Sequence, residues 1–158
     1  MNFVYISPHF PKTNWEFCDR LKQNGVTVLG IADVEYNELD EKLKNALTEY
    51  YKVSSLENYD EVLKAVGYFT FKYGKIDWLE SNNEYWLVQD SRLRSDFNIT
   101  TGIKSDKIAN IKEKSKMKKA YKKGDIPAAD FSLVTTYEKA KKFIDKVGYP
   151  VVVKPDNG

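Results

Sequence analysis

Cysteine and histidine each occur only once in this sequence of 158 residues. The single cysteine, Cys18, cannot form a disulfide within the chain, and its isolation fits a reducing compartment. The single histidine, His9, excludes a metal site or a proton relay built from several histidines. Cys18 lies on the apolar face of a predicted helix, where we expect a packed, inert thiol. For His9, which lies between Pro8 and Pro11, a surface-loop position is the favoured interpretation.

Long apolar runs are also missing. No stretch approaches the roughly 18 apolar residues that span a bilayer. The N-terminus, MNFVYISPHF, lacks the basic segment, the apolar stretch and the small-residue cleavage site of a signal peptide, so we expect a cytoplasmic protein. The composition is 42% hydrophobic and 30% charged, which is typical of a globular protein, and the aromatic share of 14% is high and requires packed surfaces. A chain of this length buries roughly two-thirds of its unfolded surface, so it has room for one domain or for one domain and part of another.

The glycine-rich motifs of common nucleotide-binding folds are absent. Neither GxGxxG nor GxxxxGK[ST] occurs, which excludes the dinucleotide fingerprint and the Walker phosphate loop. The hydrophobic pattern nevertheless predicts alternating strands and helices. Strands are expected at 2–7, 26–32, 50–53 and 75–79, and helices from 14 to 24, around 38–48, from 58, and through 86–97. The stretch 69–73 fits either a strand or a continuation of the preceding helix.

This order of elements predicts an α/β fold. Alternating strands and helices imply a parallel sheet with helices on both faces, in the doubly wound, Rossmann-like manner. The polar stretch NITTG at 98–102 is the expected domain boundary. We therefore expect a Rossmann-like domain at 1–102 and a second part, formed by linker helices and the start of another domain, at 103–158.

The second part is expected to begin with two helices. Ser105 can cap the first helix, and the apolar residues change face near Glu113–Lys114, which predicts a break there. Gly124 and Pro127 end the second helix. The remaining pattern predicts a strand at 131–136, a helix at 137–147 and a strand at 151–155.

The formal net charge of +2 conceals one lysine-rich segment. Residues 104–123 contain nine lysines against two acidic residues, a net charge of +7, and the rest of the chain carries −5. Three interpretations stay open: a solvated helix surface, a nucleic-acid contact, or lysines that bind the phosphates of a nucleotide. Aromatic residues are sparse in this segment, which disfavours nucleic acid.

Ligands of open parallel sheets bind at the carboxyl ends of the strands. This rule indicates the loop 7–10, Asp33 and the loop 80–84 as candidate sites. Arg92 and Arg94 could clamp an anion, or could equally pair with neighbouring acidic residues. The candidate substrate-binding residues are Ser7, His9, Asn83, Glu84 and Arg92.

Two lysine motifs give the most specific signal. EKSKMKKAYKKGDIPAADFSLV is followed by a helix and then by GYPVVVKPDNG. This combination resembles the ATP-grasp superfamily, and in particular its carboxylate–amine ligase-like and carbamoyl-phosphate-synthase large-subunit-like members. On that resemblance, Lys114 and Lys154 correspond to lysines that contact ATP phosphates, and Lys118 is a weaker candidate for the same role. The stretches at 7–33 and 77–99 resemble the pre-ATP-grasp domain of such proteins.

The resemblance implies the N-terminal part of an ATP-dependent ligase. Such an enzyme activates a carboxylate as an acyl phosphate, which an amine or a similar nucleophile then attacks. ATP and Mg²⁺ are the implied cofactors, with the metal ligands expected downstream of residue 158 and none in this part. The implied partners are nucleotide and small-molecule substrates, with no nucleic acid or membrane. We expect Gly158 to be a cut in a longer protein, and the 158-residue piece alone to be inactive.

Some positions depart from the family pattern. Glu113 replaces an aspartate, Gly124 comes one place early with Asp125 in its slot, and Asp130 replaces a residue that is more often basic. No catalytic residue can be named. The alternative is a non-enzymatic, Rossmann-like or flavodoxin-like binding module whose basic helical segment contacts an acidic partner.

Overall fold

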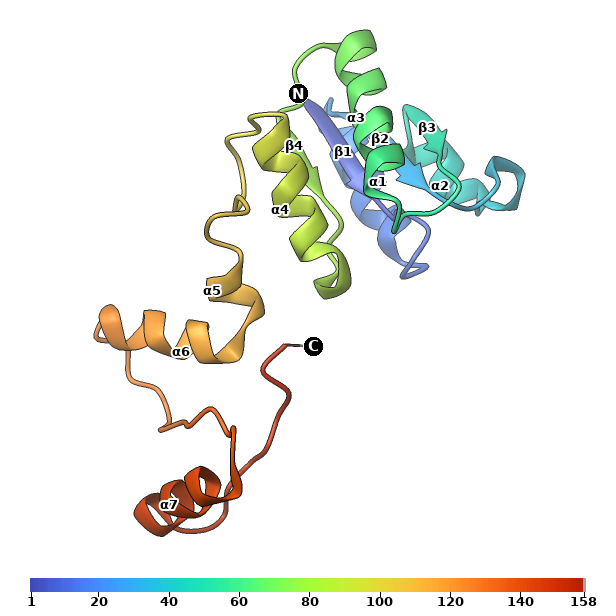
Figure 1. The fold of residues 1–158 in the computed structure, drawn as a ribbon. Coiled ribbons are helices and arrows are strands. Elements are labelled where there is room, and N and C mark those ends of the chain that lie inside the picture. Colours follow the sequence, from blue (N-terminus) through green and yellow to red (C-terminus); the bar gives the residue numbers. More distant parts are fainter. Residues whose placement is uncertain (158) are drawn as a thin grey trace. The chain divides into compact units, whose positions relative to one another are not determined.

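A computed structural model describes residues 1–157 of the chain. The chain forms two compact units, Met1–Ser105 and Asp106–Gly158, and each is described by itself. The elements of the first unit are β1 (Asn2–Ile6), α1 (Asn14–Gln23), β2 (Thr27–Ala32), η1 (Tyr36–Glu38), α2 (Glu41–Ala46), β3 (Glu49–Lys52), α3 (Tyr59–Tyr73), β4 (Trp78–Glu80), η2 (Glu84–Trp86) and α4 (Leu87–Asp96) (Figure 1).

The four strands of the first unit form one parallel sheet in the order β3-β2-β1-β4. β1 lies between β2 and β4, with Val4 opposite Leu29 of β2 and opposite Leu79 of β4. These strands are apolar runs because parallel strands between helices are buried on both faces. The position of β1 brings its carboxyl end next to those of β2 and β4.

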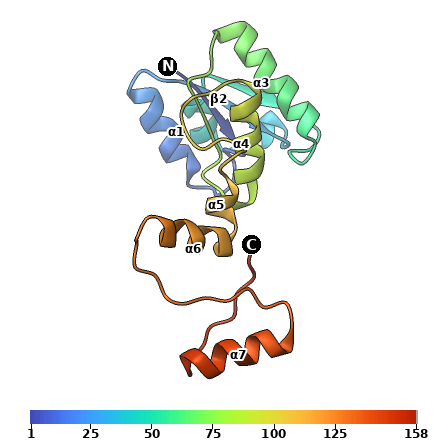
Figure 2. The same cartoon turned by 60° about the vertical axis from the view of Figure 1, so that its left-hand side comes forward.

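Each face of the sheet is covered by its own helices. Alternate residues of β1 and β2 point to opposite faces, so one run of sequence supplies two cores. On one face, Val4, Ile6 and Ile31 pack in a cluster with buried residues of α3 and α4. On the other face, Phe3 and Tyr5 pack in a cluster with residues of α1 and α2. α1 and α3 consequently lie on opposite sides of the sheet (Figure 2). This confirms the predicted doubly wound α/β fold.

The stretch 69–73, which fitted either element, is the end of α3. Phe69 is completely buried and Phe71 is 92% exposed. The alternation resembles a strand because residues two apart on a helix are rotated by about 200° and also point in nearly opposite directions. The expected strand 75–79 is displaced, since pairing with β1 begins only at Trp78.

The second unit contains three helices within its described residues. They are α5 (Ala109–Lys112), α6 (Lys114–Lys123) and α7 (Tyr137–Val147). The predicted break between the first two is confirmed at Glu113, whose φ of −96° and ψ of 115° are extended. Ser105 does not cap α5, because the capping position is occupied by Ile108.

The strands expected at 131–136 and 151–155 are wrong. No residue of either stretch pairs with another strand in the part of the chain that the structure describes. Their apolar side chains stay open to solvent, and Val153 is 86% exposed. A strand needs a neighbour for its backbone hydrogen bonds, and within residues 106–157 these two stretches do not supply one for each other. Gly158 lies outside the described residues.

Candidate functional site

A cavity of about 420 Å³ opens at the carboxyl ends of the strands in the first unit. This strand-end cavity is lined by Ser7, His9, Phe10, Asp33, Leu56, Asn83, Tyr85 and Trp86. Ser7 follows β1, Asp33 follows β2 and Asn83 follows β4, as the strand-end rule predicts. Three of the candidate substrate-binding residues, Ser7, His9 and Asn83, thus line one cavity.

A buried carboxylate fixes the loop after β4. Asp90 of α4 accepts a hydrogen bond from the backbone N–H of Ser81 at 3.0 Å and from the Ser81 hydroxyl at 2.6 Å. The loop continues to Asn83, whose side chain caps η2 by accepting from the backbone N–H of Tyr85 at 3.0 Å. Burial raises the pKa of Asp90 from 3.8 to about 7, against the lowering effect of its bonds to Ser81. Asp90 therefore does not line the cavity, but its hydrogen bonds to Ser81 fix the loop that carries Asn83.

His9 lines the cavity and carries one buried polar atom that is unpaired. Its Nδ1 is buried and has no hydrogen-bond partner within residues 1–157. Burial lowers the His9 pKa below its ordinary value, and the negative charge of Asp33 partly opposes this effect. The lower pKa favours the neutral imidazole. His9 lies in the loop after β1, as the sequence favoured, and is half-buried there while it lines the cavity.

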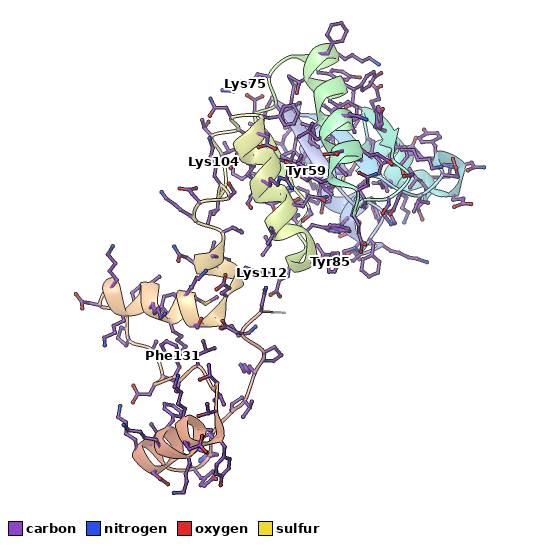
Figure 3. The ribbon with its side chains drawn as sticks, viewed as in Figure 1. Tyr59, Lys75, Tyr85, Lys104, Lys112 and Phe131 are labelled. Carbon is purple, nitrogen blue, oxygen red and sulfur yellow. The ribbon has the colours of Figure 1, made fainter. Side chains whose placement is uncertain are left out.

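Two other candidates lie elsewhere. Neither Glu84 nor Arg92 lines the strand-end cavity. The Arg92 guanidinium stacks 3.6 Å from the ring centroid of Tyr59, whose hydroxyl bonds Asp96, so these side chains join α3 to α4 (Figure 3).

The Arg94 side chain is buried within the first unit and does not serve a ligand. Its guanidinium donates to the carbonyl oxygens of Leu79 and Ile103, both at 2.9 Å, and to Glu80 at 2.7 Å. The residue is 2% exposed. These contacts anchor the segment after α4 to β4, and they exclude the anion clamp that we considered for Arg94.

In the second unit, the segment that follows Lys154 meets the start of α6. The backbone N–H of Lys114 donates to the carbonyl oxygen of Asp156 at 2.9 Å. The Asp156 carboxylate accepts from the backbone N–H of Ser115 at 2.7 Å and from the Ser115 hydroxyl at 2.9 Å. The hydrogen bonds from the Ser115 backbone N–H and, second in effect, from the Ser115 hydroxyl lower the pKa of Asp156. The nearby positive charges of Lys114 and Lys116 act in the same direction.

These contacts bring the two lysine motifs together along the backbone. Lys114 is half-buried at the first position of α6, and Lys154 is exposed two residues before the capping carboxylate. The expected place of Lys154 on a strand is wrong, because residues 151–155 form none. Lys154 is therefore held by the cap at Asp156 and not by a sheet.

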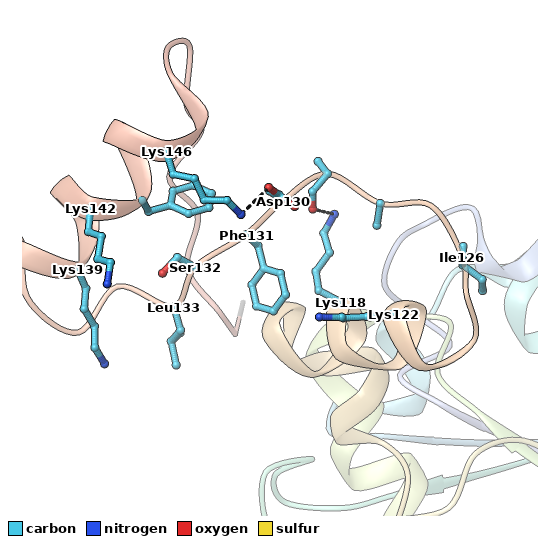
Figure 4. A pocket seen from close by; sticks show the side chains of 13 residues that line it. Lys118, Lys122, Ile126, Asp130, Phe131, Ser132, Leu133, Lys139, Lys142 and Lys146 are labelled. Carbon is cyan, nitrogen blue, oxygen red and sulfur yellow. Dashed lines mark hydrogen bonds and ion pairs between the residues drawn. The ribbon is translucent and has the colours of Figure 1, made fainter.

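A second cavity, of about 720 Å³, lies within the second unit between α6, α7 and the segment 126–133. Lys118 and Lys122 reach it from α6, and Lys139, Lys142 and Lys146 from α7 (Figure 4). Asp130, paired with Lys146 at 3.3 Å, is the only acidic residue among the residues that line it. We call it the basic cavity. Neither Lys114 nor Lys154 lines it.

Sequence reasoning singled out only Lys118 in the basic cavity. Lys118 and Lys122 are four residues apart, and Lys139, Lys142 and Lys146 follow helical spacing on α7. This periodicity was a usable signal, since residues three, four or seven apart share one face of a helix. Lys118 donates to the carbonyl oxygen of Ala129 at 3.4 Å.

The lysines of the two motifs, Lys114 and Lys154, and those of the basic cavity are suited to phosphate. Ammonium groups are compact point charges that bind phosphate oxygens. No group of three or more His, Cys, Asp or Glu side chains within residues 1–157 could hold a metal. No helix among these residues combines the length and the apolar character that crossing a bilayer requires.

No protein-family model matches the sequence, and no curated protein matches it. Solved structures do. An L-amino acid ligase from Bacillus licheniformis matches with a TM-score of 0.69 and 18% identity, over 99% of this chain and 37% of that one. The biotin carboxylase domain of the Hydrogenobacter thermophilus 2-oxoglutarate carboxylase matches with a TM-score of 0.72 and 19% identity, over 99% and 35%. N5-carboxyaminoimidazole ribonucleotide synthetase from Thermotoga maritima matches with a TM-score of 0.67 and 18% identity, over 99% and 39%.

These neighbours are ATP-grasp enzymes, and their N-terminal region is the pre-ATP-grasp domain. The chain spans less than two-fifths of the length of each. It therefore has the fold of the N-terminal region of ATP-grasp enzymes, as its motifs imply. At these identities the likeness establishes the fold and leaves the reaction to be argued from the residues.

Proposed function

We propose that the chain is the N-terminal part of an ATP-dependent ligase. The ligase phosphorylates a carboxylate with ATP, and an amine or a similar nucleophile displaces the phosphate from the acyl phosphate. The fold that the chain shares with ATP-grasp enzymes over 99% of its length supports this proposal. One neighbour was crystallised with MgADP, ADP and bicarbonate, which is consistent with ATP and Mg²⁺ as cofactors.

The observation that carries the proposal is the contact between Asp156 and the start of α6. Three hydrogen bonds join Asp156 to Lys114 and Ser115, across about forty residues of sequence. They tie the backbone beside Lys154 to the helix turn that begins with Lys114. Two ammonium groups on segments joined in this way can share one polyphosphate, because a charge-assisted contact to phosphate needs only a short reach.

Within this proposal, Lys114 and Lys154 bind the phosphates of ATP and Lys118 assists them. Each lysine offsets charge that moves toward the leaving phosphate during transfer, which is the main contribution that a protein makes to phosphoryl transfer. Mg²⁺, whose ligands we expect downstream of residue 158, would neutralise phosphate charge when bound. Residues 1–102 form the pre-ATP-grasp domain and 103–158 the start of the ATP-grasp domain, in a cytoplasmic protein.

Nucleotide binding to the full-length protein tests the lysines. Calorimetric titration with ATP should show affinity reduced about tenfold or more by Lys114→Ala or Lys154→Ala, because each removes a charge-assisted contact of roughly 1.5–3 kcal/mol. Lys123→Ala is the matched control, since it removes an equal charge from the exposed end of α6. Equal affinities for all three variants would refute the assignment. Binding that responds steeply to salt but not to these substitutions would favour the non-enzymatic module with its acidic partner.

Steady-state kinetics test the first unit. Substituting Asn83, which lines the strand-end cavity, should raise the Michaelis constant of the non-nucleotide substrate in the full-length enzyme and leave that of ATP unchanged. Unchanged kinetics would remove Asn83 from the site. The 158-residue chain itself should show no turnover with ATP and Mg²⁺.

The DNA sequence gives the cheapest test. The codons that follow residue 158 should encode a glycine-rich loop. A gene without glycine there would contradict the ligase.

A further inference from the structure

The strand-end cavity carries charge of one sign only. Asp33 is the one charged side chain among its lining residues, and no lysine or arginine of residues 1–157 lines it. The Asp33 side chain is exposed, and its Oδ2 accepts a hydrogen bond from the backbone N–H of Leu56 at 3.2 Å. A carboxylate accepts up to about four hydrogen bonds, so this one leaves Asp33 free to accept more. The cavity therefore attracts cations and repels carboxylates.

His9, which also lines the cavity, adds no charge that would offset Asp33. Burial lowers the His9 pKa, which favours the neutral imidazole, although the negative charge of Asp33 partly opposes this effect. The unpaired Nδ1 is buried and faces no open space, so it offers nothing to a ligand. Asp33 therefore sets the charge of the cavity by itself.

Aromatic side chains form another part of the wall. Tyr85 and Trp86 pack edge to face with ring centroids 4.7 Å apart, and Phe10 also lines the cavity. Ring faces attract ammonium groups. The Tyr85 hydroxyl donates to Glu57 at 2.7 Å, which brings a second carboxylate near the cavity.

From these contacts we infer that the strand-end cavity binds a small molecule through a primary ammonium group, with Asp33 as its counter-charge and the aromatic side chains beside it. An ammonium has three donors and no acceptor, which matches a wall that offers an exposed carboxylate and aromatic faces. The inference rests on the proposed ligase only for the role of the ligand, as the substrate of that ligase that carries the amino group. A cavity of about 420 Å³ is in the range of small-molecule sites.

The test uses the 158-residue chain and three probes of matched shape: n-butylammonium, n-butyrate and n-butanol. Backbone amide shifts of the ¹⁵N-labelled chain should move and saturate with n-butylammonium at Ser7, His9, Asp33 and Asn83, and should not move with n-butyrate. Asp33→Asn should weaken the ammonium affinity by about tenfold or more, because a charge-assisted contact is lost.

Asp19→Asn is the control, since it removes the same charge from α1 and Asp19 does not line the cavity. Equal binding of n-butyrate, an unchanged affinity of Asp33→Asn, or no saturating shift with n-butylammonium would each overturn the inference. These titrations need no nucleotide. Failure of the ATP titration with the Lys114 and Lys154 variants would therefore refute the ligase and leave the ammonium result unaffected, and the reverse also holds.

Discussion

Replacing Arg94 by methionine should destabilise the first unit strongly. The methionine keeps an apolar stem but removes the three hydrogen bonds that Arg94 donates to the carbonyl oxygens of Leu79 and Ile103 and to the Glu80 carboxylate. Breaking a buried charged pair costs about 3–5 kcal/mol. Glu80 is 22% exposed and regains water, so the lower half of that range applies, about 3–4 kcal/mol. Domains are stable by only about 5–15 kcal/mol.

Urea unfolding of the chain, followed by tryptophan fluorescence and far-ultraviolet circular dichroism, measures this loss. Arg92→Met is the matched control, two residues away on the same helix, where the exposed guanidinium contributes only a stacking contact with Tyr59 of about 0.5–1 kcal/mol. Arg94→Lys should fall between the two, because an ammonium cannot reproduce the planar fork. If Arg94→Met and Arg92→Met differ by less than about 1 kcal/mol, the guanidinium does not hold the segment after α4.

Three further changes probe other contacts. Gly102→Ala should lower the free energy of unfolding in urea more than Gly74→Ala, because both residues have positive φ but only at Gly102 would the added Cβ lie 2.8 Å from the Arg94 side chain. Equal losses would argue against close packing at Gly102. Because the folded pKa of Asp90 is raised to about 7, the free energy of unfolding should fall by up to about 4 kcal/mol as pH rises from about 4 to 7. Urea titrations at several pH values should show a flatter slope for Asp90→Asn. Asp156 has a lowered pKa, so the stability that it contributes is present above the unfolded pKa and is lost as pH falls through the folded pKa. Asp156→Ala should speed amide exchange at the start of α6, and unchanged exchange would show that Asp156 does not cap that helix.

The sheet of the first unit could be predicted because its strands are buried on both faces. A run such as 2–7 is apolar at nearly every position, and few other structures require that. The ends of the strands were harder to predict. Ile76 is buried although it precedes β4, so the apolar pattern placed the start of this strand before its first paired residue. The strands expected at 131–136 and 151–155 have the right side chains. Strand formation also depends on a partner, which no local pattern contains.

The candidate site was predictable in its position and less so in its composition. The carboxyl ends of the strands located Ser7, Asp33 and Asn83, because parallel strands end at one edge. The contributions of Leu56 and Tyr85 follow from how η2 and the loop before α3 fold back over that edge, which no spacing in the sequence encodes.

β1 lies between two strands that are made later than it is. During synthesis, Asn2–Ile6 are made before β2 and β4, and β4 is complete only when Glu80 has been made. The sheet therefore cannot close until residue 80 exists, and losing residues 2–6 would remove the strand that joins β2 to β4. An affinity tag joined to Met1 should for this reason carry a flexible spacer, because the Met1 carbonyl oxygen accepts a hydrogen bond from the backbone N–H of Thr27.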